Sequence, residues 1–327
     1  MIGLANLKGN RAMRTAMLTL TVLATAIACW LPAVPARAQP IRVFVSNTGL
    51  DSNPCTFAQP CKSAQHAHDT VAAGGELRML DPASYGLMTI TKAISILGDG
   101  HGGIAASGGS TAITINAGAN DKINIRGVLL EGFGTGNNGV TFNSGASLNI
   151  QECMIRNFAG GGINFTPNAS SKLSVSHTLV SDIGGNFGIS IVPTGSGTVF
   201  GILNHVEINN ITGGQGLLVN GQGSSGVVKI SITDSVIANN GTNALTSQSQ
   251  GAAPTAVVIR NSTIANNSSA GLVASGGSAS ILVTRTTITG NGTGFNPISS
   301  GALSSYGDNN LDGNTTAGSP TSTLGYH

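Results

Sequence analysis

The amino-acid sequence predicts an all-β solenoid. Three observations point to it: a repeated ten-residue phrase, a strand-like spacing of the apolar residues, and too little chain between copies for a helix. The phrase occurs seven times, for example as LNIQECMIRN and ISITDSVIAN, at intervals of 24 to 29 residues. A repeat of roughly 20 to 50 residues is typical of solenoids and arrays. The copies begin at Ile123, Leu148, Leu173, Gly201, Ile230, Val257 and Ile281.

Each repeat predicts three short strands. Apolar residues occupy the first, third and eighth places of nearly every copy, and the spacing from first to third is the strand period of two. A second apolar pair follows about six residues later, usually opened by glycine, as in GVTF from Gly139 and GISI from Gly188. Leucine-rich and ankyrin repeats are excluded because each needs a helix or long 3₁₀ segment per unit. We therefore expect about 25 residues per coil.

Residues 1–38 are predicted to be a secretory signal peptide. Three basic residues precede an apolar stretch from Ala16 to Leu31, and Ala36-Arg37-Ala38 provides a small-x-small cleavage site. We expect export, and hence a periplasmic, cell-surface or extracellular location.

Cleavage changes the charge balance. The chain has 15 basic and 13 acidic residues, and the signal removes four basic residues and no acidic one, which leaves 11 against 13. No basic stripe remains for nucleic-acid phosphates or anionic lipid. We expect no nucleic-acid partner and no integral membrane segment after cleavage. The four basic residues lost are Lys8, Arg11, Arg14 and Arg37.

Residues 39–75 are predicted to form an N-terminal strand, a disulfide loop and a short capping helix. Cys55 and Cys61 flank a short proline-containing loop, and an oxidising compartment favours a disulfide over two free thiols. The stretch SAQHAHDTV from Ser63 has an N-cap serine followed by apolar residues at helical spacing. Such a helix would protect the first coil from edge-to-edge pairing.

The coils are predicted over residues 76–314, and residues 315–327 are predicted to be a loose tail. A degenerate phrase beginning at Ser304 is the last coil. Cys153 stands at the sixth place of its copy, where other copies have small residues, so we expect a buried and inert thiol.

The entry segment and the repeat together resemble the pectate-lyase-like superfamily of right-handed parallel β-helix proteins. The segments that carry the resemblance are VFVSNTGLDSNPC, PCKSAQHAHDTV, GGELRML and ASYGLMTITKAISILGDG, followed by the repeated ΨxΨxxxxΨxxN and GΨxΨ. The resemblance covers roughly residues 42–314 and is closest to secreted bacterial members without assigned activity. It implies a single right-handed β-helix, and a fold does not settle a function.

The family's enzymes set the test for a catalytic site. Its lyases use calcium-holding carboxylates with an arginine or lysine base, and its hydrolases use aspartates near a Gly-His-Gly. The residue between each GΨxΨ apolar pair should face solvent, and none of these residues titrates near neutrality. They are Thr141, Asn164, Ser190, Leu218, Thr246, Val273 and Asn296.

The fifth place of the phrase collects most of the clustered polar groups. Adjacent members should lie about 4.8 Å apart and form a continuous ridge. Glu152, His177, His205 and Asp234 are candidate catalytic residues, with the histidines as base and acid or as metal ligands. The favoured alternative is a structural corner, because bends with positive φ prefer Gly, Asn, Asp and His. The fifth-place ridge comprises Gly127, Glu152, His177, His205, Asp234, Asn261 and Arg285, followed by Asp308 if the last phrase keeps its register.

Two other groups are better explained as structure. Gly100-His101-Gly102 matches the polygalacturonase tripeptide, but it comes in the first coils and the family's other motifs are absent, so a turn is favoured. His66 and His68 lie two places apart on the expected helix and would not share a metal, so a solvated capping helix is favoured there.

Three functions remain open at the level of sequence. The leading one is an exported protein without catalytic apparatus, which contacts neutral glycans along its Asn, Ser and Thr side chains. The second is a polysaccharide lyase or glycoside hydrolase that uses the fifth-place ridge. The third is a structural or adhesive surface module. No cofactor and no metal site is predicted.

Overall fold

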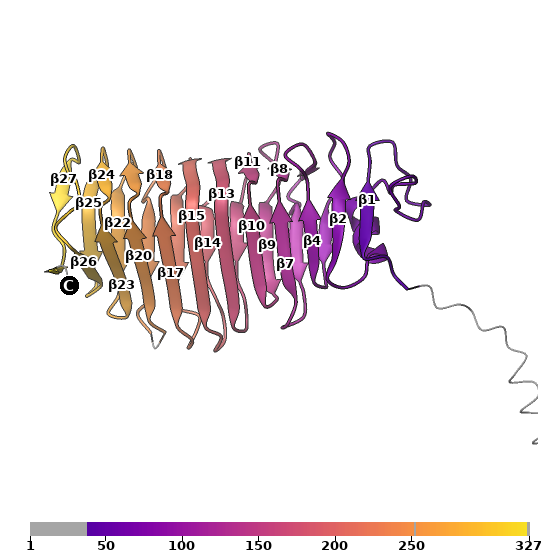
Figure 1. Ribbon diagram of the computed structural model, residues 1–327. Helices are drawn as coiled ribbons and strands as arrows, with labels where there is room; N and C mark the ends of the chain where they lie inside the picture. Colours follow the sequence, from indigo (N-terminus) through magenta and orange to yellow (C-terminus); the bar gives the residue numbers. More distant parts are fainter. Residues whose placement is uncertain (1–37, 252, 326–327) are drawn as a thin grey trace, which may run out of the picture. The chain divides into compact units, whose positions relative to one another are not determined.

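The computed structural model describes residues 38–251 and 253–325. The predicted signal peptide lies outside the described residues, apart from Ala38. Residues 39–327 form one compact unit, in which strands of successive coils lie side by side in chain order (Figure 1). Every strand pair is parallel, within one 18-stranded sheet and one 10-stranded sheet. The expected all-β solenoid is confirmed.

Each coil contributes up to three strands, two to the larger sheet and one to the smaller. The first strands of the larger sheet are β1 (Arg42–Val45), β2 (Gly75–Met79), β4 (Ile94–Leu97), β7 (Lys122–Arg126), β10 (Ser147–Gln151), β13 (Ser171–Ile183), β15 (Val199–Ile211), β17 (Val228–Thr233), β20 (Thr255–Arg260), β23 (Ala279–Thr284), β26 (Ala302–Ser305) and β28 (Ser322–Thr323). Its second strands are β5 (Gly103–Ala105), β8 (Leu129–Glu131), β11 (Met154–Arg156), β18 (Val236–Ala238), β21 (Thr263–Ala265) and β24 (Thr287–Thr289). The smaller sheet comprises β3 (Met88–Ile90), β6 (Ile113–Asn116), β9 (Asn138–Ser144), β12 (Gly161–Phe165), β14 (Phe187–Ile191), β16 (Gln215–Asn220), β19 (Leu245–Gln248), β22 (Ala270–Ser275), β25 (Thr293–Ile298) and β27 (Thr316–Gly318).

The repeated phrase sets the register. The first place of each copy pairs with the first place of the next, from Ile123 through Leu148 to Leu303. The eighth place is buried in every copy, so the predicted inward columns are confirmed. Its members are Leu130, Ile155, Val180, Ile208, Ile237, Ile264 and Ile288. In-register stacking extends to aromatic side chains, since the rings of Phe142 and Phe165 stack with centroids 4.5 Å apart.

A ladder of asparagines follows the phrase, at its eleventh place in three successive copies and at Asn314 after the last copy. The Asn240 amide donates to the Asn267 carbonyl oxygen at 2.8 Å, Asn267 donates to Asn291 at 2.8 Å, and Asn291 donates to Asn314 at 2.9 Å. Each Oδ1 also accepts a backbone N–H from the preceding coil, as Asn267 does from Asn240 at 3.2 Å. Polar groups of the turn are thereby satisfied inside the structure.

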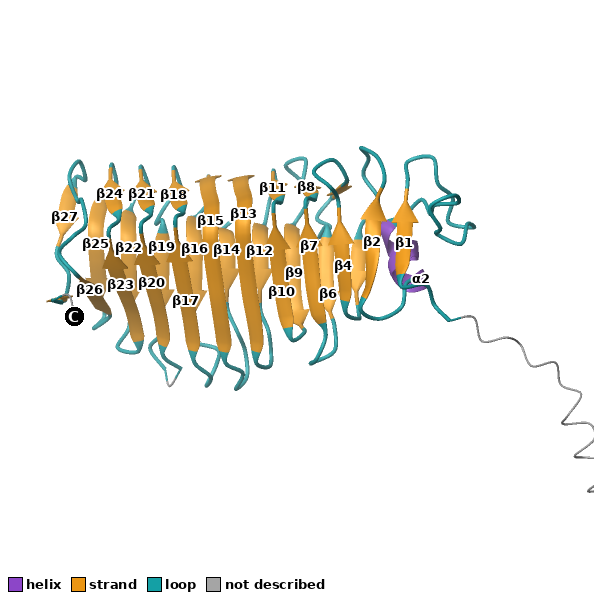
Figure 2. Ribbon diagram, in the orientation of Figure 1, coloured by secondary structure: helices purple, strands orange, loops and turns teal. Residues whose placement is uncertain are grey.

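The N-terminal cap is the helix α2 (Ala64–Thr70), which lies beside β1 (Figure 2) and also packs against β3. Ser63 is its N-cap, and the Ser63 hydroxyl accepts the His66 N–H at 3.2 Å. Ala64, Ala67 and His68 form its buried face. This confirms the predicted helix.

The C-terminal segment differs from the expected loose tail. β27 pairs with β25, and β28 pairs with β26. The solenoid therefore continues through Thr323. This segment pairs with the backbone N–H and C=O groups of β25 and β26 that would otherwise be unpaired. At the other end β1 already pairs with β2, so the larger sheet begins at Arg42, before the expected start of the coils.

Candidate functional site

The fifth-place ridge is a line of backbone bends. All seven members from Gly127 to Arg285 have positive φ, between 46° and 63°. Gly, Asn, Asp and His accept this conformation readily, whereas Glu152 (54°) and Arg285 (46°) are residue types that avoid it. Their adoption of the bend shows that the register of the neighbouring coils determines the backbone here. The expected structural corner is present at each of these seven places.

Asp308 does not continue the ridge. Leu303, and not Ser304, pairs with Ile281, so the last phrase is shifted by one residue from the expected register. Gly307, with φ 76°, therefore takes the fifth place. Asp308 instead accepts a hydrogen bond from the Thr284 hydroxyl at 2.6 Å.

Glu152 is held by an arginine from the preceding coil. Arg126 donates to the Glu152 carboxylate through Nε at 3.0 Å and through Nη2 at 3.1 Å, and Gln151 donates a third hydrogen bond at 3.1 Å. The hydrogen bond from Arg126, together with its charge, lowers the pKa of Glu152 below its ordinary value. A carboxylate with this environment is a poor general acid near neutral pH.

His177 and His205 are brought together as a stacked pair. Their ring centroids lie 4.8 Å apart with an interplanar angle of 6°, the separation that in-register coils impose. His205 Nδ1 also shares a 2.9 Å hydrogen bond with the Asn204 side chain. The two rings therefore face each other in parallel and do not converge on a common point.

Asp234 belongs to a hydrogen-bonded strip with its asparagine neighbours. Asn261 donates a hydrogen bond to one carboxylate oxygen, and Asn204 donates to the other at 3.4 Å. Glu152, His177, His205 and Asp234 thus line up along the ridge as predicted. The polar atoms of Glu152, His205 and Asp234 are hydrogen-bonded mainly to side chains at the fourth place, directly beside the ridge.

A shallow hollow of about 450 Å³ lies beside one part of the ridge. Its lining includes Glu152, Cys153, Met154 and His177, but not His205 or Asp234. The structure therefore brings one acid and one imidazole to a common cavity and leaves the other two candidates outside it. Cys153 is a buried free thiol at the edge of this hollow, and burial raises its pKa to about 11, so it is unreactive as a nucleophile near neutral pH.

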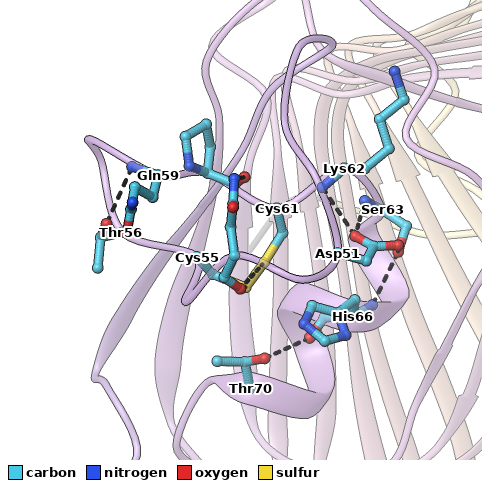
Figure 3. Close-up of a disulfide and its surroundings, with 11 residues drawn as sticks. Asp51, Cys55, Thr56, Gln59, Cys61, Lys62, Ser63, His66 and Thr70 are labelled. Atoms are coloured by element: carbon cyan, nitrogen blue, oxygen red, sulfur yellow. Dashed lines mark hydrogen bonds between the residues drawn. A yellow bond between two sulfur atoms is a disulfide. The ribbon is translucent and has the colours of Figure 1, made fainter.

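The disulfide loop lies against the helix cap (Figure 3). Cys55 and Cys61 are joined with their Cα atoms 4.6 Å apart, and both are buried. Asp51 accepts hydrogen bonds from the Ser63 N–H and the Ser63 hydroxyl, each at 2.8 Å, and from the Lys62 N–H at 2.9 Å. Burial alone would raise the pKa of Asp51, but these hydrogen bonds outweigh it and lower the pKa.

The two histidines of helix α2 have different surroundings. His68 is buried, hydrogen-bonded to Asp69 at 2.8 Å, and accepts the Thr91 N–H at Nε2, so it ties the helix to the first coil. Within residues 38–251 and 253–325, the three side chains close enough together to hold a metal ion are those of Cys55, Cys61 and His66. Two of the three ligand atoms are sulfurs of the disulfide.

Gly100 and His101 lie in an exposed turn, as expected, and Gly102 is buried at its end. Gly100 has φ 83°, and the His101 N–H donates to the Gly98 carbonyl at 3.1 Å. A Cβ at Gly102 would lie 2.4 Å from Met79 Cβ, so close packing explains this glycine.

The residues between the GΨxΨ apolar pairs lie on the outer side of the smaller sheet, but not all of them face solvent. Thr141, Asn164 and Asn296 are half-exposed. The other four are buried, which corrects the expectation. An outward side chain inside a parallel sheet has neighbours about 4.8 Å away on both sides, so a short one is shielded by taller ones. The buried members are Ser190, Leu218, Thr246 and Val273.

A neutral hollow of about 340 Å³ opens on this outer side, at β9, β12 and β14. Asn164 accepts the Ser190 hydroxyl at 2.7 Å, and Asn138 donates to Thr141 at 3.1 Å. Several lining residues could not be predicted from the strand pattern, because they lie in the turns before the strands. The signal available was an asparagine one or two residues before the Gly of two copies, Asn138 before Gly139 and Asn186 before Gly188. The polar lining comprises Asn137, Asn138, Asn164, Thr166, Asn186 and Ser190.

Within the part of the chain that the structure describes, no helix has the length and apolar character needed to span a bilayer.

Comparison with solved structures supports the fold. No family model and no curated protein matches the sequence. Among solved structures, pectate lyase Pel9A is similar over 81% of this chain and 74% of its own, at 14% identity and a TM-score of 0.57. The periplasmic alginate epimerase AlgG (12% identity, 77% and 72% coverage) and the Azotobacter vinelandii mannuronan C-5 epimerase AlgE4 A-module (12%, 78% and 91%) have TM-scores of 0.42 and 0.38. The first likeness concerns the fold, and the other two add nothing to it.

Proposed function

We propose that this right-handed parallel β-helix is an exported protein that contacts neutral glycans without cleaving them, in the periplasm, at the cell surface or outside the cell. The observation that carries the proposal is the neutral hollow on the smaller sheet. The amide groups of Asn138, Asn164 and Asn186 offer paired donors and acceptors, and Thr166 adds a hydroxyl, so the lining suits sugar hydroxyls. The absence of net charge at this surface favours a neutral over an anionic polymer.

The ridge supports the non-catalytic half of the proposal. Glu152 is ionised and paired with Arg126, and Asp234 is held by two asparagines. General acid catalysis requires a proton donor whose pKa lies near the working pH, and the Glu152 pKa is shifted away from that range. Export is proposed from the basic, apolar and small-x-small pattern of residues 1–38, and a disulfide between Cys55 and Cys61 is compatible with it.

An enzyme remains the second candidate, because Glu152 and His177 line a common hollow. In that case the chemistry would be hydrolysis or elimination on a polysaccharide, with Glu152, His177, His205 and Asp234 as the residues to test. A structural or adhesive module is the third candidate. It requires no ligand at either hollow.

Binding to an array of neutral oligosaccharides, followed by calorimetry on the hits, tests the proposal. We expect Asn164→Ala to weaken binding roughly tenfold, the effect of losing one or two hydrogen bonds to a ligand. Asn296→Ala is the matched control, since Asn296 occupies the same place of a later coil outside the hollow. Equal affinities of the two variants would contradict the assignment of the neutral hollow.

The catalytic alternative has its own assay. We expect no cleavage of polygalacturonate with or without calcium, and unchanged glycan binding in the His177→Ala, His205→Ala double variant. Cleavage by the wild-type protein that the folded double variant loses would establish the enzyme and overturn the proposal.

A further inference from the structure

A third hollow, of about 410 Å³, lies on the larger sheet beside β5 and β8. Its lining combines an aromatic ring with polar groups, chiefly Ser84, His101, Glu131, Phe133 and Arg156. The volume falls within the range of roughly 300 to 1,000 Å³ typical of small-molecule sites. None of the residues proposed above for glycan binding lines it.

Phe133 is placed in this hollow at an energetic cost. Its side chain is 67% exposed and its φ is 50°, a conformation that is an outlier for a bulky residue. In the next coil the residue at the same place of the phrase is Phe158, and it is fully buried. The turn between Gly132 and Gly139 is two residues longer than the turn between Asn157 and Gly162. The longer turn places Phe133 at the surface, where most of the residue is exposed, and not in the core.

A buried carboxylate fixes this turn. Glu131 is 8% exposed, and its Oε1 accepts the Phe133 N–H at 3.1 Å and the Asn157 amide at 2.8 Å. Its Oε2 accepts Arg156 Nε at 2.8 Å. Thr135 and Gly136 close the turn by donating to the Gly132 carbonyl at 3.0 and 2.7 Å. The aromatic ring is therefore presented by a preorganised turn and not by a loose loop.

Polar groups with unused hydrogen-bonding capacity surround the ring. The Arg156 side chain is 42% exposed and uses Nε for Glu131, while its terminal amino groups make no hydrogen bond to the described residues. His101 is exposed at the rim, and the Ser84 hydroxyl accepts the Ala105 N–H while keeping its own proton to donate. The charges of Glu131 and Arg156 offset each other, so the hollow does not select an ion.

We infer that this hollow is a second saccharide subsite, which binds one pyranose unit of a neutral glycan. The apolar C–H face of the sugar stacks on the Phe133 ring, and the sugar hydroxyls bond to Arg156, His101 and Ser84. An aromatic face beside a few fixed polar groups matches an amphipathic ring better than a wholly apolar ligand. The inference rests on the proposed glycan-binding function and deepens it, because it places a contact on the other sheet.

Calorimetric titration of the full-length protein with cellotetraose and mannotetraose tests the inference, with tetragalacturonate as the anionic comparison. We expect Phe133→Ala and Phe133→Gly to weaken binding of a neutral tetrasaccharide by roughly tenfold, the loss typical of one stacking contact. Phe57→Ala is the matched control, since Phe57 is 70% exposed but lies in the disulfide loop. Phe133→Gly should also keep or raise the melting temperature, because glycine adopts positive φ without strain.

The outcomes separate the two proposals. Binding by the Phe133 variants equal to wild type, with loss in Asn164→Ala, overturns this inference and leaves the neutral hollow standing. Loss in the Phe133 variants alone supports the inference and contradicts the neutral hollow. Tighter binding of tetragalacturonate than of either neutral sugar, or a lowered melting temperature of Phe133→Gly, overturns the inference.

Discussion

At the scale of single residues, position in the coil outweighs intrinsic preference. Glu152 and Arg285 adopt φ values of 54° and 46°, although a left-handed conformation costs roughly 1–2 kcal/mol for such residues. The preference of Asn, Asp, Gly and His for bends predicts the other five members of the ridge. The remaining two could not be predicted from residue type, because the neighbouring coils impose their bend.

The inward column gives the first residue-scale prediction. Ile237 is 1% exposed at the eighth place, so Ile237→Asp buries an unpaired carboxylate among apolar side chains. We expect a loss of more than about 4 kcal/mol in unfolding free energy, which thermal or denaturant unfolding measures. Asn239→Gly is the control two residues away, where φ is 57°, and it should be nearly neutral. An unchanged melting temperature in Ile237→Asp would contradict the register.

Glu131 gives a pH-dependent prediction. Burial alone would raise its pKa, but hydrogen bonds from Asn157, the Phe133 N–H and Arg156 lower it below the ordinary 4.5. The Glu131 carboxylate therefore binds a proton more readily in the unfolded state than in the folded state. Its contribution to the free energy of unfolding is present above about pH 4.5 and is lost as the pH falls through the folded pKa. We expect the difference in melting temperature between wild type and Glu131→Gln to be largest above pH 5. A difference that grows towards pH 3 would contradict this assignment.

At the scale of elements, the phrase predicts strand positions and inward faces, but not how far each outward side chain is exposed. Apolar spacing is a local property, so it identifies β17 and β18 as separate strands around Asp234. Shielding depends on side chains one coil away, which is why Ser190 and Thr246 are buried against expectation. β13 and β15 run through their bends as single strands because their ladder continues on both sides, with Thr178 paired to Val206.

The asparagine ladder predicts a large effect from a polar deletion. Asn267→Ala removes the acceptor of the Asn240 N–H and the donor to Asn291, both in buried surroundings. We expect a loss of about 2–3 kcal/mol, because buried polar groups are left unsatisfied. Asn266→Gly, one residue earlier at an exposed bend with φ 56°, should change stability little. Chemical denaturation measures the unfolding free energy of both variants. Equal values would show that the asparagine ladder does not stabilise the fold.

At the scale of the whole molecule, both ends of the stack require protection, and the two protections differ in how far they are predictable. The N-terminal helix has a local signature in Ser63 and its spaced apolar residues. The C-terminal strands β27 and β28 have none, because they are two or three residues long and are defined by pairing to β25 and β26. The Phe133 hollow escaped prediction for a related reason, since it depends on a two-residue lengthening of one turn.

Truncation tests the C-terminal protection. Deletion of residues 315–327 uncovers the ladder groups of β25 and β26 beside the buried Phe295 and Leu303. Uncovered strand edges pair with other chains, so we expect concentration-dependent association in light scattering coupled to size exclusion. Deletion of residues 324–327 keeps both strands and should leave the elution unchanged. If the protein that lacks residues 315–327 stays monodisperse, the two strands do not protect this end from association.

The unbroken column of first-place residues, from Ile123 to Leu303, has a consequence for how such a chain changes over time. Each coil meets the one before it and the one after it through the same places, so a duplicated or lost coil leaves every remaining contact type intact. The molecule lengthens or shortens in increments of about 4.8 Å. Only the turns carry features that belong to a single coil. Duplication of the coil with the Phe133 turn would therefore add a ligand-binding position at a fixed spacing without redesign of the interior.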